Sequence, residues 1–185
     1  MIKRNGMKYA LIMILSIFCL PAAAQSSLMD SSIVKLSGES VMLSQYSGRK
    51  LLVIILPTAH AVSDTVYIQK LASVCDHNSN RLVIIGVLSY EDGYRDSLSA
   101  VLKTWYSAYS RPNLLITAGM HTRKNTESAQ NPLFKWLTDA GRNGHFDQDA
   151  GGVNQKFLID QLGYLCGVYD ARTGLSLRSI QKIMH

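Results

Sequence analysis

The sequence predicts an α/β fold of three layers, in which helices cover both faces of a central mixed sheet and a hairpin precedes the sheet. Residues 51–56 (LLVIIL) and 82–88 (LVIIGVL) are continuous apolar runs, which are typical of strands buried on both faces. A stretch with apolar residues at helical spacing follows each run, at residues 63–78 and 96–109. Buried strands that alternate with helices predict a core of parallel strands.

The elements of the N-terminal half follow from local signals. Residues 32–35 and 40–43 are short β-prone pieces that flank Ser37-Gly38-Glu39, and they predict a hairpin. After the first buried strand, Ser63 is the expected N-cap of a helix, with Asp64 in the first turn. The second helix is predicted from the spacing of its apolar side chains, which are Leu98, Val101, Leu102 and Trp105.

The middle of the chain predicts a third strand and a short helix. Pro112 precedes the strand expected at residues 114–117. Residues 131–137 predict a short helix, because Pro132 would stand in its first turn, where proline is tolerated. The polar, glycine-rich residues 138–153 predict a loop.

The last elements predict an antiparallel edge for the sheet. Residues 157–160 and 165–169 flank Gly163, and this arrangement indicates a second hairpin. A closing helix is expected at residues 175–184. No internal repeat or linker interrupts this order, so we expect a single domain.

The first 24 residues have the pattern of a secretory signal peptide. A positively charged start precedes an apolar run at residues 10–20 and the motif PAAA at residues 21–24, which offers cleavage before Gln25. The run is shorter than the roughly 20 residues that a transmembrane helix needs. We therefore expect residues 1–24 to be removed and residues 25–185 to form the domain, periplasmic or secreted, with membrane contact only through the export signal.

The charge of the chain excludes one class of partner. The formal net charge is +6, and it falls to +3 without the signal, which holds three basic residues and no acidic one. No run of lysines and arginines with interleaved aromatic residues is present in the sequence. Nucleic acid is therefore not an expected partner.

Two cysteines remain after the signal, Cys75 and Cys166. In an oxidising compartment they could form one disulfide or a redox pair. They could equally be two buried thiols that act as small apolar residues. The sequence leaves both interpretations open, because a disulfide requires the two Cα atoms within about 7 Å.

Three segments carry a resemblance to a known family. Residues 43–49 read LSQYSGR, residues 131–137 read NPLFKWL, and residues 156–160 read KFLID and are followed by Gly163. These segments resemble, in order, the entry to the first core strand, a short helix and a hairpin of the glutathione peroxidase family. The resemblance spans residues 43–169 and implies a thioredoxin-like fold, with the three layers and the N-terminal hairpin expected above.

The resemblance also implies a chemistry, and this sequence departs from it. The family reduces peroxides with a cysteine or selenocysteine at the N-terminus of the first long helix, surrounded by a glutamine, a tryptophan and an asparagine. Residues 58–61 contain no cysteine, and His60 stands at the position of the nucleophile. Glu91 replaces the glutamine, Asn154 lies one position late for the asparagine, and the tryptophan is missing.

The expected function is that of an exported glutathione peroxidase-like binding module without the family's peroxidase chemistry. Loss of the nucleophile removes the covalent route and not merely part of the rate. We assign no catalytic residue, cofactor or metal, and the partner is an unknown protein or small-molecule ligand. The degenerate site positions are His60, Glu91 and Asn154.

Two alternative functions stay open. The first is a thiol-dependent peroxidase or redox protein that uses Cys75 and Cys166, although neither cysteine is expected at a helix N-terminus, where the thiol pKa is lowered. The second is a metal-binding module around His60, in which Glu91 would stand at the end of the neighbouring strand. His121 and His145 lack ligand spacing and are expected to be solvated loop residues.

Overall fold

The computed structural model describes residues 27–59, 61–124 and 129–174. The expected signal peptide, His60 and the expected closing helix lie outside the described residues. Within the described ranges, no helix has the length and hydropathy that a membrane crossing requires.

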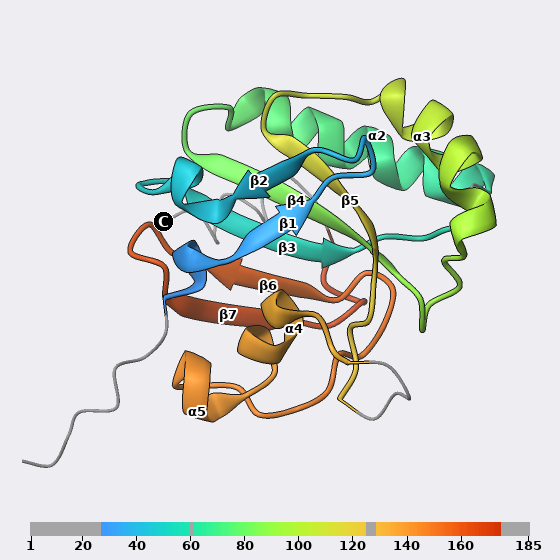
Figure 1. Cartoon of the computed structure of the whole chain (residues 1–185). Coiled ribbons are helices and arrows are strands. Elements are labelled where there is room, and N and C mark those ends of the chain that lie inside the picture. The colour runs from blue at the N-terminus through green and yellow to red at the C-terminus, as the bar shows by residue number, and fades with distance from the viewer. Residues whose placement is uncertain (1–26, 60, 125–128, 175–185) are drawn as a thin grey trace, which may run out of the picture.

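A mixed sheet of five strands forms the centre of the molecule (Figure 1). Its order is β5-β4-β3-β6-β7, in which β3, β4 and β5 are parallel, β6 is antiparallel to β3, and β7 is antiparallel to β6. The expected parallel core with an antiparallel hairpin at one edge is confirmed. The strands are β3 (Lys50–Ile55), β4 (Leu82–Ser89), β5 (Leu114–Met120), β6 (Lys156–Ile159) and β7 (Leu165–Tyr169).

The central strand β3 supplies side chains to two separate cores. Leu51, Val53 and Ile55 belong to the core on one face of the sheet, and Leu52 and Ile54 belong to the core on the other face. All five side chains are fully buried. A continuous apolar run therefore gives a strand that must be covered on both sides.

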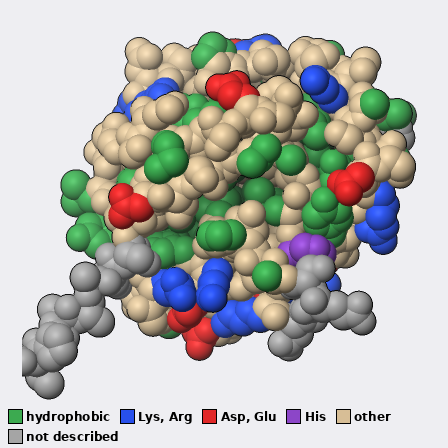
Figure 2. All heavy atoms as spheres, viewed as in Figure 1, with side chains coloured by type: hydrophobic (Ala, Val, Ile, Leu, Met, Phe, Trp, Pro, Cys, Tyr) green, Lys and Arg blue, Asp and Glu red, His purple; other side chains and the backbone are tan. Residues whose placement is uncertain are grey.

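Different elements cover the two faces. The long helix α2 (Val62–His77) and α3 (Ser99–Ser107) cover one face. The other is covered by α4 (Pro132–Leu137) and by the antiparallel hairpin of β1 (Ser32–Val34) and β2 (Ser40–Met42), as Figure 1 shows. Hydrophobic side chains show between this hairpin and α4 in Figure 2. Short 3-10 turns flank the hairpin at Leu28–Asp30 (η1) and Leu43–Tyr46 (η2).

Helix α2 begins one residue before the expected N-cap. Its N-cap is Ala61, so the assignment of Ser63 as the cap is wrong. The carboxylate of Asp64 accepts a hydrogen bond from the backbone N–H of Ala61 at 3.0 Å. The negative charge of Asp64, the third helical residue, interacts favourably with the positive end of the helix dipole. The N-cap residue, an alanine, has no side-chain acceptor of its own.

The second helical region is divided into a 3-10 turn, η3 (Asp96–Leu98), and α3 (Ser99–Ser107). Its buried face is formed by Leu102 and Tyr106, which lie four residues apart. The side chain of Val101 is about half exposed, at 49 %. The expectation that Val101 belongs to the buried stripe is therefore wrong, because Leu102, the next residue, lies on the face that packs on the sheet.

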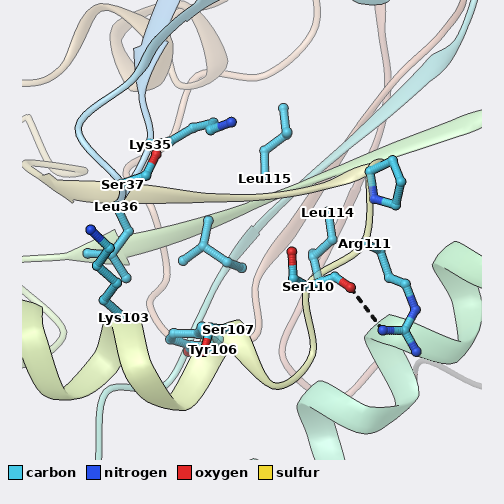
Figure 3. A pocket seen from close by; sticks show the side chains of 12 residues that line it. Lys35, Leu36, Ser37, Lys103, Tyr106, Ser107, Ser110, Arg111, Leu114 and Leu115 are labelled. Carbon is cyan, nitrogen blue, oxygen red and sulfur yellow. Dashed lines mark hydrogen bonds between the residues drawn. The ribbon is translucent and has the colours of Figure 1, made fainter.

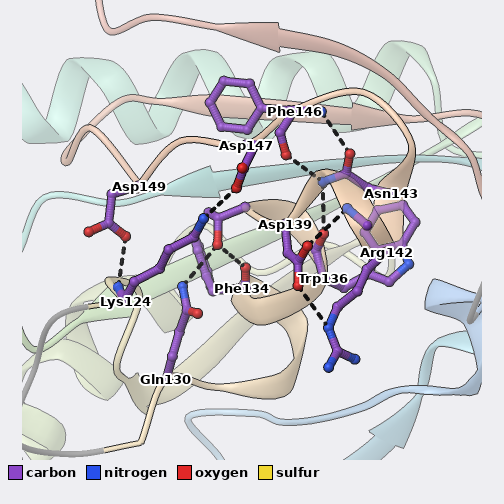
Figure 4. A network of polar contacts seen from close by, with 12 residues as sticks. Lys124, Gln130, Phe134, Trp136, Asp139, Arg142, Asn143, Phe146, Asp147 and Asp149 are labelled. Atoms are coloured by element: carbon purple, nitrogen blue, oxygen red, sulfur yellow. Dashed lines mark hydrogen bonds and ion pairs between the residues drawn. The ribbon is translucent and has the colours of Figure 1, made fainter.

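The stretch 138–153 is more ordered than the expected loop, because it contains the short helix α5 (Ala140–Asn143). The carboxylate of Asp139 caps α5 by accepting from the N–H of Gly141 at 2.9 Å. The side-chain amide of Asn143 donates to the carbonyls of Trp136 and Phe146, both at 2.9 Å (Figure 4). Side-chain hydrogen bonds of this kind hold an irregular backbone without a sheet partner.

One buried side chain joins helix α2 to the starts of β4 and β5. Asn113 is 2 % exposed, and its amide donates to the carbonyls of Cys75 and Leu82 at 3.1 and 3.0 Å. Its own backbone carbonyl accepts from the N–H of Ile84 at 2.8 Å. Asn113 thereby fixes the end of α2 against the amino ends of two parallel strands.

We expect Asn113→Ala to lower the free energy of unfolding by about 2–3 kcal/mol, because it removes two hydrogen bonds and leaves a buried carbonyl without a donor. Urea unfolding monitored by circular dichroism measures this change. The exposed neighbour Asn80 provides the matched control, Asn80→Ala, which should leave the midpoint in place. An equal midpoint for both variants would contradict this role of Asn113.

Candidate functional site

The loops that follow β3, β4 and β5 meet the loop before β6 at the end of the sheet where the three parallel strands terminate. Thr58, after β3, donates from Oγ1 to the carbonyl of Asp92, after β4, at 3.4 Å. Arg123, after β5, donates from Nη2 to Oδ1 of Asp92 at 3.1 Å. A Cβ on Gly152, before β6, would lie 2.9 Å from the same oxygen. We call this surface the strand-end face, since open α/β sheets bind ligands at this position.

Two of the three degenerate site positions lie on the strand-end face. Glu91 lies two residues after Ser89, the last residue of β4. Asn154 donates from its backbone N–H to the carbonyl of Ile55, the last residue of β3, at 2.8 Å. His60, the third position, lies outside the described residues.

The carboxylate of Glu91 is held by four donors. Its Oε2 accepts from the N–H of Thr122 at 3.0 Å, from the hydroxyl of Thr122 at 3.2 Å and from the hydroxyl of Ser89 at 3.1 Å. Its Oε1 lies 2.8 Å from Nδ1 of His121. The side chain is only 10 % exposed, so these contacts replace the water that the charge has lost.

These contacts keep Glu91 ionised. Burial raises the pKa of Glu91, but the hydrogen bonds from Thr122, His121 and Ser89 outweigh it and lower the pKa to about 2. Because an ionised carboxylate only accepts hydrogen bonds, Nδ1 of His121 carries the hydrogen in this pair. The negative charge of Glu91 therefore binds the loop that follows β5, through His121 and Thr122.

His121 is a site residue that the sequence does not reveal. It lies in a loop, as expected, but it is only partly solvated, because its side chain is 30 % exposed and its Nδ1 is bound to Glu91. Its ring stacks on that of Tyr90, with centroids 4.8 Å apart. The sequence places the end of the third strand at residue 117, so His121 is expected to lie away from the strand end. Strand β5 continues to Met120, which places His121 directly at a strand end.

Two buried oxygen atoms of the strand-end face have no hydrogen-bond donor among the described residues. They are Oδ2 of Asp92, whose side chain is 9 % exposed, and Oδ1 of Asn154. The backbone of Asn154 has a φ of 70°, in the left-handed region that asparagine tolerates. Buried acceptors without donors are rare, and a ligand or water that donates hydrogen bonds would satisfy them.

The two cysteines lie away from the strand-end face and are free thiols. Cys75 is buried in α2, with its sulfur 3.8 Å from the carbonyl of Asn113, near the amino end of β5. Cys166 is on β7, at the opposite edge of the sheet. Strands β5 and β7 are four spacings apart, about 19 Å at the usual strand separation.

Neither thiol is activated. Burial, followed by the charge of Asp76, raises the pKa of Cys75 to about 12. Partial burial of the Cys166 sulfur, followed by the charge of Asp160, raises the pKa of that thiol as well. Both thiols are therefore protonated at neutral pH, whereas a reactive cysteine needs a lowered pKa.

No group of three or more His, Cys, Asp or Glu side chains suited to a metal ion occurs among the described residues. His145, which the sequence places in a polar loop, donates from its backbone N–H to Oδ1 of Asn143 at 2.8 Å. A metal centre around His60 stays a prediction, because that residue lies outside the described ranges.

Comparison with known proteins shows the fold of the chain. No family model and no curated protein matches the sequence. Among solved structures, Trgpx shares 21 % identity at a TM-score of 0.61, with 86 % of this chain and 93 % of that chain covered. GPX1 of T. cruzi shares 18 % identity at a TM-score of 0.59, with 86 % and 94 % covered.

The similarity extends beyond these two proteins. The exposed lipoprotein thioredoxin Etrx1 of Streptococcus pneumoniae shares 17 % identity at a TM-score of 0.55, with 84 % of this chain and 97 % of that chain covered. Together with the five-stranded mixed sheet and its covering helices, these neighbours show that the chain has a thioredoxin-like α/β fold.

The low pKa of Glu91 predicts a stability that depends on pH. Because the folded pKa, about 2, is below the ordinary value of 4.5, the contribution is complete above pH 4.5 and is lost as the pH falls toward 2. The full contribution is about 3 kcal/mol. Glu91→Gln should therefore destabilise the protein at neutral pH and flatten the loss of stability in acid.

Urea unfolding at about pH 7 and at about pH 3 measures both effects, and the exposed Glu39→Gln is the control. Equal pH dependence in Glu91→Gln and in the unaltered protein would show that the carboxylate is not the group responsible.

Proposed function

We propose that this chain is an exported, glutathione peroxidase-like protein that lacks the family's peroxidase chemistry and acts as a binding module through its strand-end face. One observation carries the proposal. Helix α2 begins at Val62, and residues 58–61, which precede it, are Thr, Ala, His and Ala. The place where the resemblance puts a thiolate therefore contains no group that peroxide can oxidise and a reductant can restore.

The contacts of Glu91 support the loss of this chemistry. In the family a neutral glutamine amide at this position can donate a hydrogen bond to the nucleophile. An ionised carboxylate cannot donate, and its four acceptor contacts bind it to Ser89, His121 and Thr122. A negative charge here would also disfavour a second negative charge nearby.

The protonated state of both cysteines argues against the thiol-dependent alternative. Cys75 is 0 % exposed, so a peroxide cannot reach its sulfur without local opening of the core. Cys166 is exposed, but no second thiol lies within disulfide distance of it among the described residues.

The strand-end face has the properties of a binding surface. Asp92 and Asn154 each have a buried oxygen atom without a donor among the described residues, and the side chain of Arg123, which is paired with Asp92, is 39 % exposed. Val62 and Val66, one turn apart at the start of α2, are 84 % and 47 % exposed. A partner that offers a hydrogen-bond acceptor to Arg123 and buries small apolar side chains would complement this face.

Export is supported by the N-terminal pattern of charge, apolar run and small residues at positions 1–24. One structural neighbour is described as an exposed lipoprotein, and another as a secreted disulfide oxidoreductase of Mycobacterium tuberculosis. A periplasmic or extracellular location agrees with both.

We expect the protein to consume neither hydrogen peroxide nor an organic hydroperoxide, with glutathione or with thioredoxin as reductant. The reason is the absent nucleophile, since Cys75 and Cys166 are protonated at neutral pH. Peroxide consumption is measured beside a Cys75→Ser/Cys166→Ser double variant. Turnover that disappears in the variant would mean that one of these thiols is the nucleophile, and the proposal would fall.

The export part of the proposal is tested separately. Expressed in a bacterium from its first residue, the protein should be recovered from the periplasm or the medium with Gln25 at its N-terminus. N-terminal sequencing of the recovered protein identifies the cut. Recovery from the cytoplasm with residues 1–24 attached would contradict export.

A further inference from the structure

One lysine lies inside the molecule. Lys156, the first residue of β6, is 1 % exposed, although lysine is among the residue types that are least often fully buried. Its neighbours across the sheet are Ile54 on β3 and Tyr169 on β7. An apolar side chain at this position would avoid the cost of taking an ammonium group out of water, so the presence of the lysine calls for an explanation.

The ammonium group of Lys156 contacts two segments that are separated by the whole β6–β7 hairpin. Its Nζ donates to the carbonyl of Asn154, in the loop before β6, at 2.7 Å. It also donates to the carbonyl of Asp170, in the turn after β7, at 3.3 Å. We call these two contacts together the Lys156 clasp.

The clasp differs from the contacts of the other basic side chains. Arg111, in the groove at the amino end of β5, binds the carboxylate of Asp76 at 2.6 Å and the carbonyl of Ser110 at 2.9 Å (Figure 3). Among the described residues, no carboxylate forms an ion pair with Lys156. Burial lowers the pKa of Lys156, and the charge of Asp170 opposes this shift only in part. The two carbonyls are therefore the main compensation for the buried charge.

The loop before β6 has a strained backbone at the residue that the clasp holds. Asn154 has a φ of 70°, in the left-handed region, which is unfavourable for a residue with a Cβ. Its N–H donates to the carbonyl of Ile55 at 2.8 Å, and its own carbonyl accepts from Lys156. Because both backbone groups of Asn154 are bonded, the surrounding structure maintains this conformation.

The turn after β7 is held by the side chain of its first residue. The carboxylate of Asp170 accepts from the N–H groups of Arg172 and Thr173, at 2.9 and 3.1 Å. The backbone carbonyl of Asp170 accepts from the N–H of Thr173 and from Nζ of Lys156, both at 3.3 Å. A change in this turn therefore moves an acceptor of the buried ammonium group.

We propose that the Lys156 clasp couples the turn after β7 to the loop before β6, so that a change at Asp170 alters the conformation of Asn154 on the strand-end face. Strand β6 is paired with β3 on one side and with β7 on the other, so the backbone of Lys156 is fixed. Loss of one carbonyl would leave the buried charge with a single acceptor among the described residues. This penalty links the two conformations, and Lys156 is a positioning residue for both.

Hydrogen exchange followed by NMR tests the clasp. In Lys156→Met, which keeps an unbranched side chain and removes its donors, the amide hydrogens of Asn154 and Thr173 should exchange about tenfold faster, as expected for loss of a hydrogen bond to a charged group. The urea midpoint should fall by less than about 0.5 M, because removal of the buried charge offsets the lost contacts. Lys70→Met, at an exposed lysine on α2, should change neither.

Two outcomes of this experiment would overturn the proposal. The first is unchanged exchange at Asn154 in Lys156→Met. The second is exchange that becomes faster by the same factor in β3 and β4, since Lys156 would then stabilise the whole fold and would not position these two segments.

A second variant tests the coupling. Asp170→Ala removes the carboxylate that holds the turn and leaves the backbone carbonyl in place. It should speed exchange at Asn154 when Lys156 is present, and it should have no further effect at Asn154 in Lys156→Met. An equal effect in both backgrounds would show that the clasp does not carry the coupling.

A measurement on the unaltered protein does not depend on the folding of any variant. The Nζ of Lys156 should give an NMR signal with a scalar coupling across the hydrogen bond to the carbonyl carbon of Asn154. Hydrogens on this Nζ that exchange with water as fast as those of an exposed lysine would overturn the clasp. A measured peroxidase activity would overturn the proposed function and leave the clasp unaffected.

Discussion

Strand β3 has apolar side chains on both of its faces, and the rest of the structure depends on the need to keep both faces out of water. Its side chains from Leu51 to Leu56 are fully buried in two cores. Helices α2 and α3 exclude water from one face, and the β1–β2 hairpin with α4 excludes it from the other. Each Å² of apolar surface removed from water stabilises the folded state by about 25 cal/mol. Burial of these side chains is therefore the dominant favourable contribution to folding. It also forces polar loops to the ends of the strands, where backbone groups can reach water.

The strand-end face shows what happens to polar side chains that such a fold partly buries. Glu91 loses most of its water and recovers hydrogen bonds from Ser89, His121 and Thr122. Asp92 recovers only one ion pair, with Arg123, and leaves its second oxygen without a donor. The first arrangement satisfies the carboxylate, and the second leaves one buried acceptor without a donor among the described residues. The same surface therefore combines a carboxylate whose hydrogen bonds are satisfied with one that is satisfied only in part.

Strand β5 forms one edge of the sheet, and its carboxyl end leads into the strand-end face. The backbone of Lys35 forms an antiparallel β-bridge with Thr117, near the middle of this strand. The backbone N–H of Leu36 donates to the carbonyl of Ile116 at 2.8 Å. The hairpin that carries Lys35 thus covers part of the exposed edge of β5, a common way to protect an edge strand.

The sequence by itself determined the class of fold, because short apolar runs such as residues 51–56 alternate with stretches of helical spacing, and residues 131–137 carry their own helix signals. It also determined that residues 58–61, directly before the first long helix, contain no cysteine. Only the tertiary structure decided the partners of Glu91, the contacts of His121 and the exposure of Val101. The pattern of apolar and polar residues reflects local periodicity only. The contacts between Glu91 and His121 depend on where β5 ends, and the exposure of Val101 depends on how α3 packs against the sheet. The two buried oxygen atoms at Asp92 and Asn154 belong to this second group, since their lack of donors is a property of four loops together.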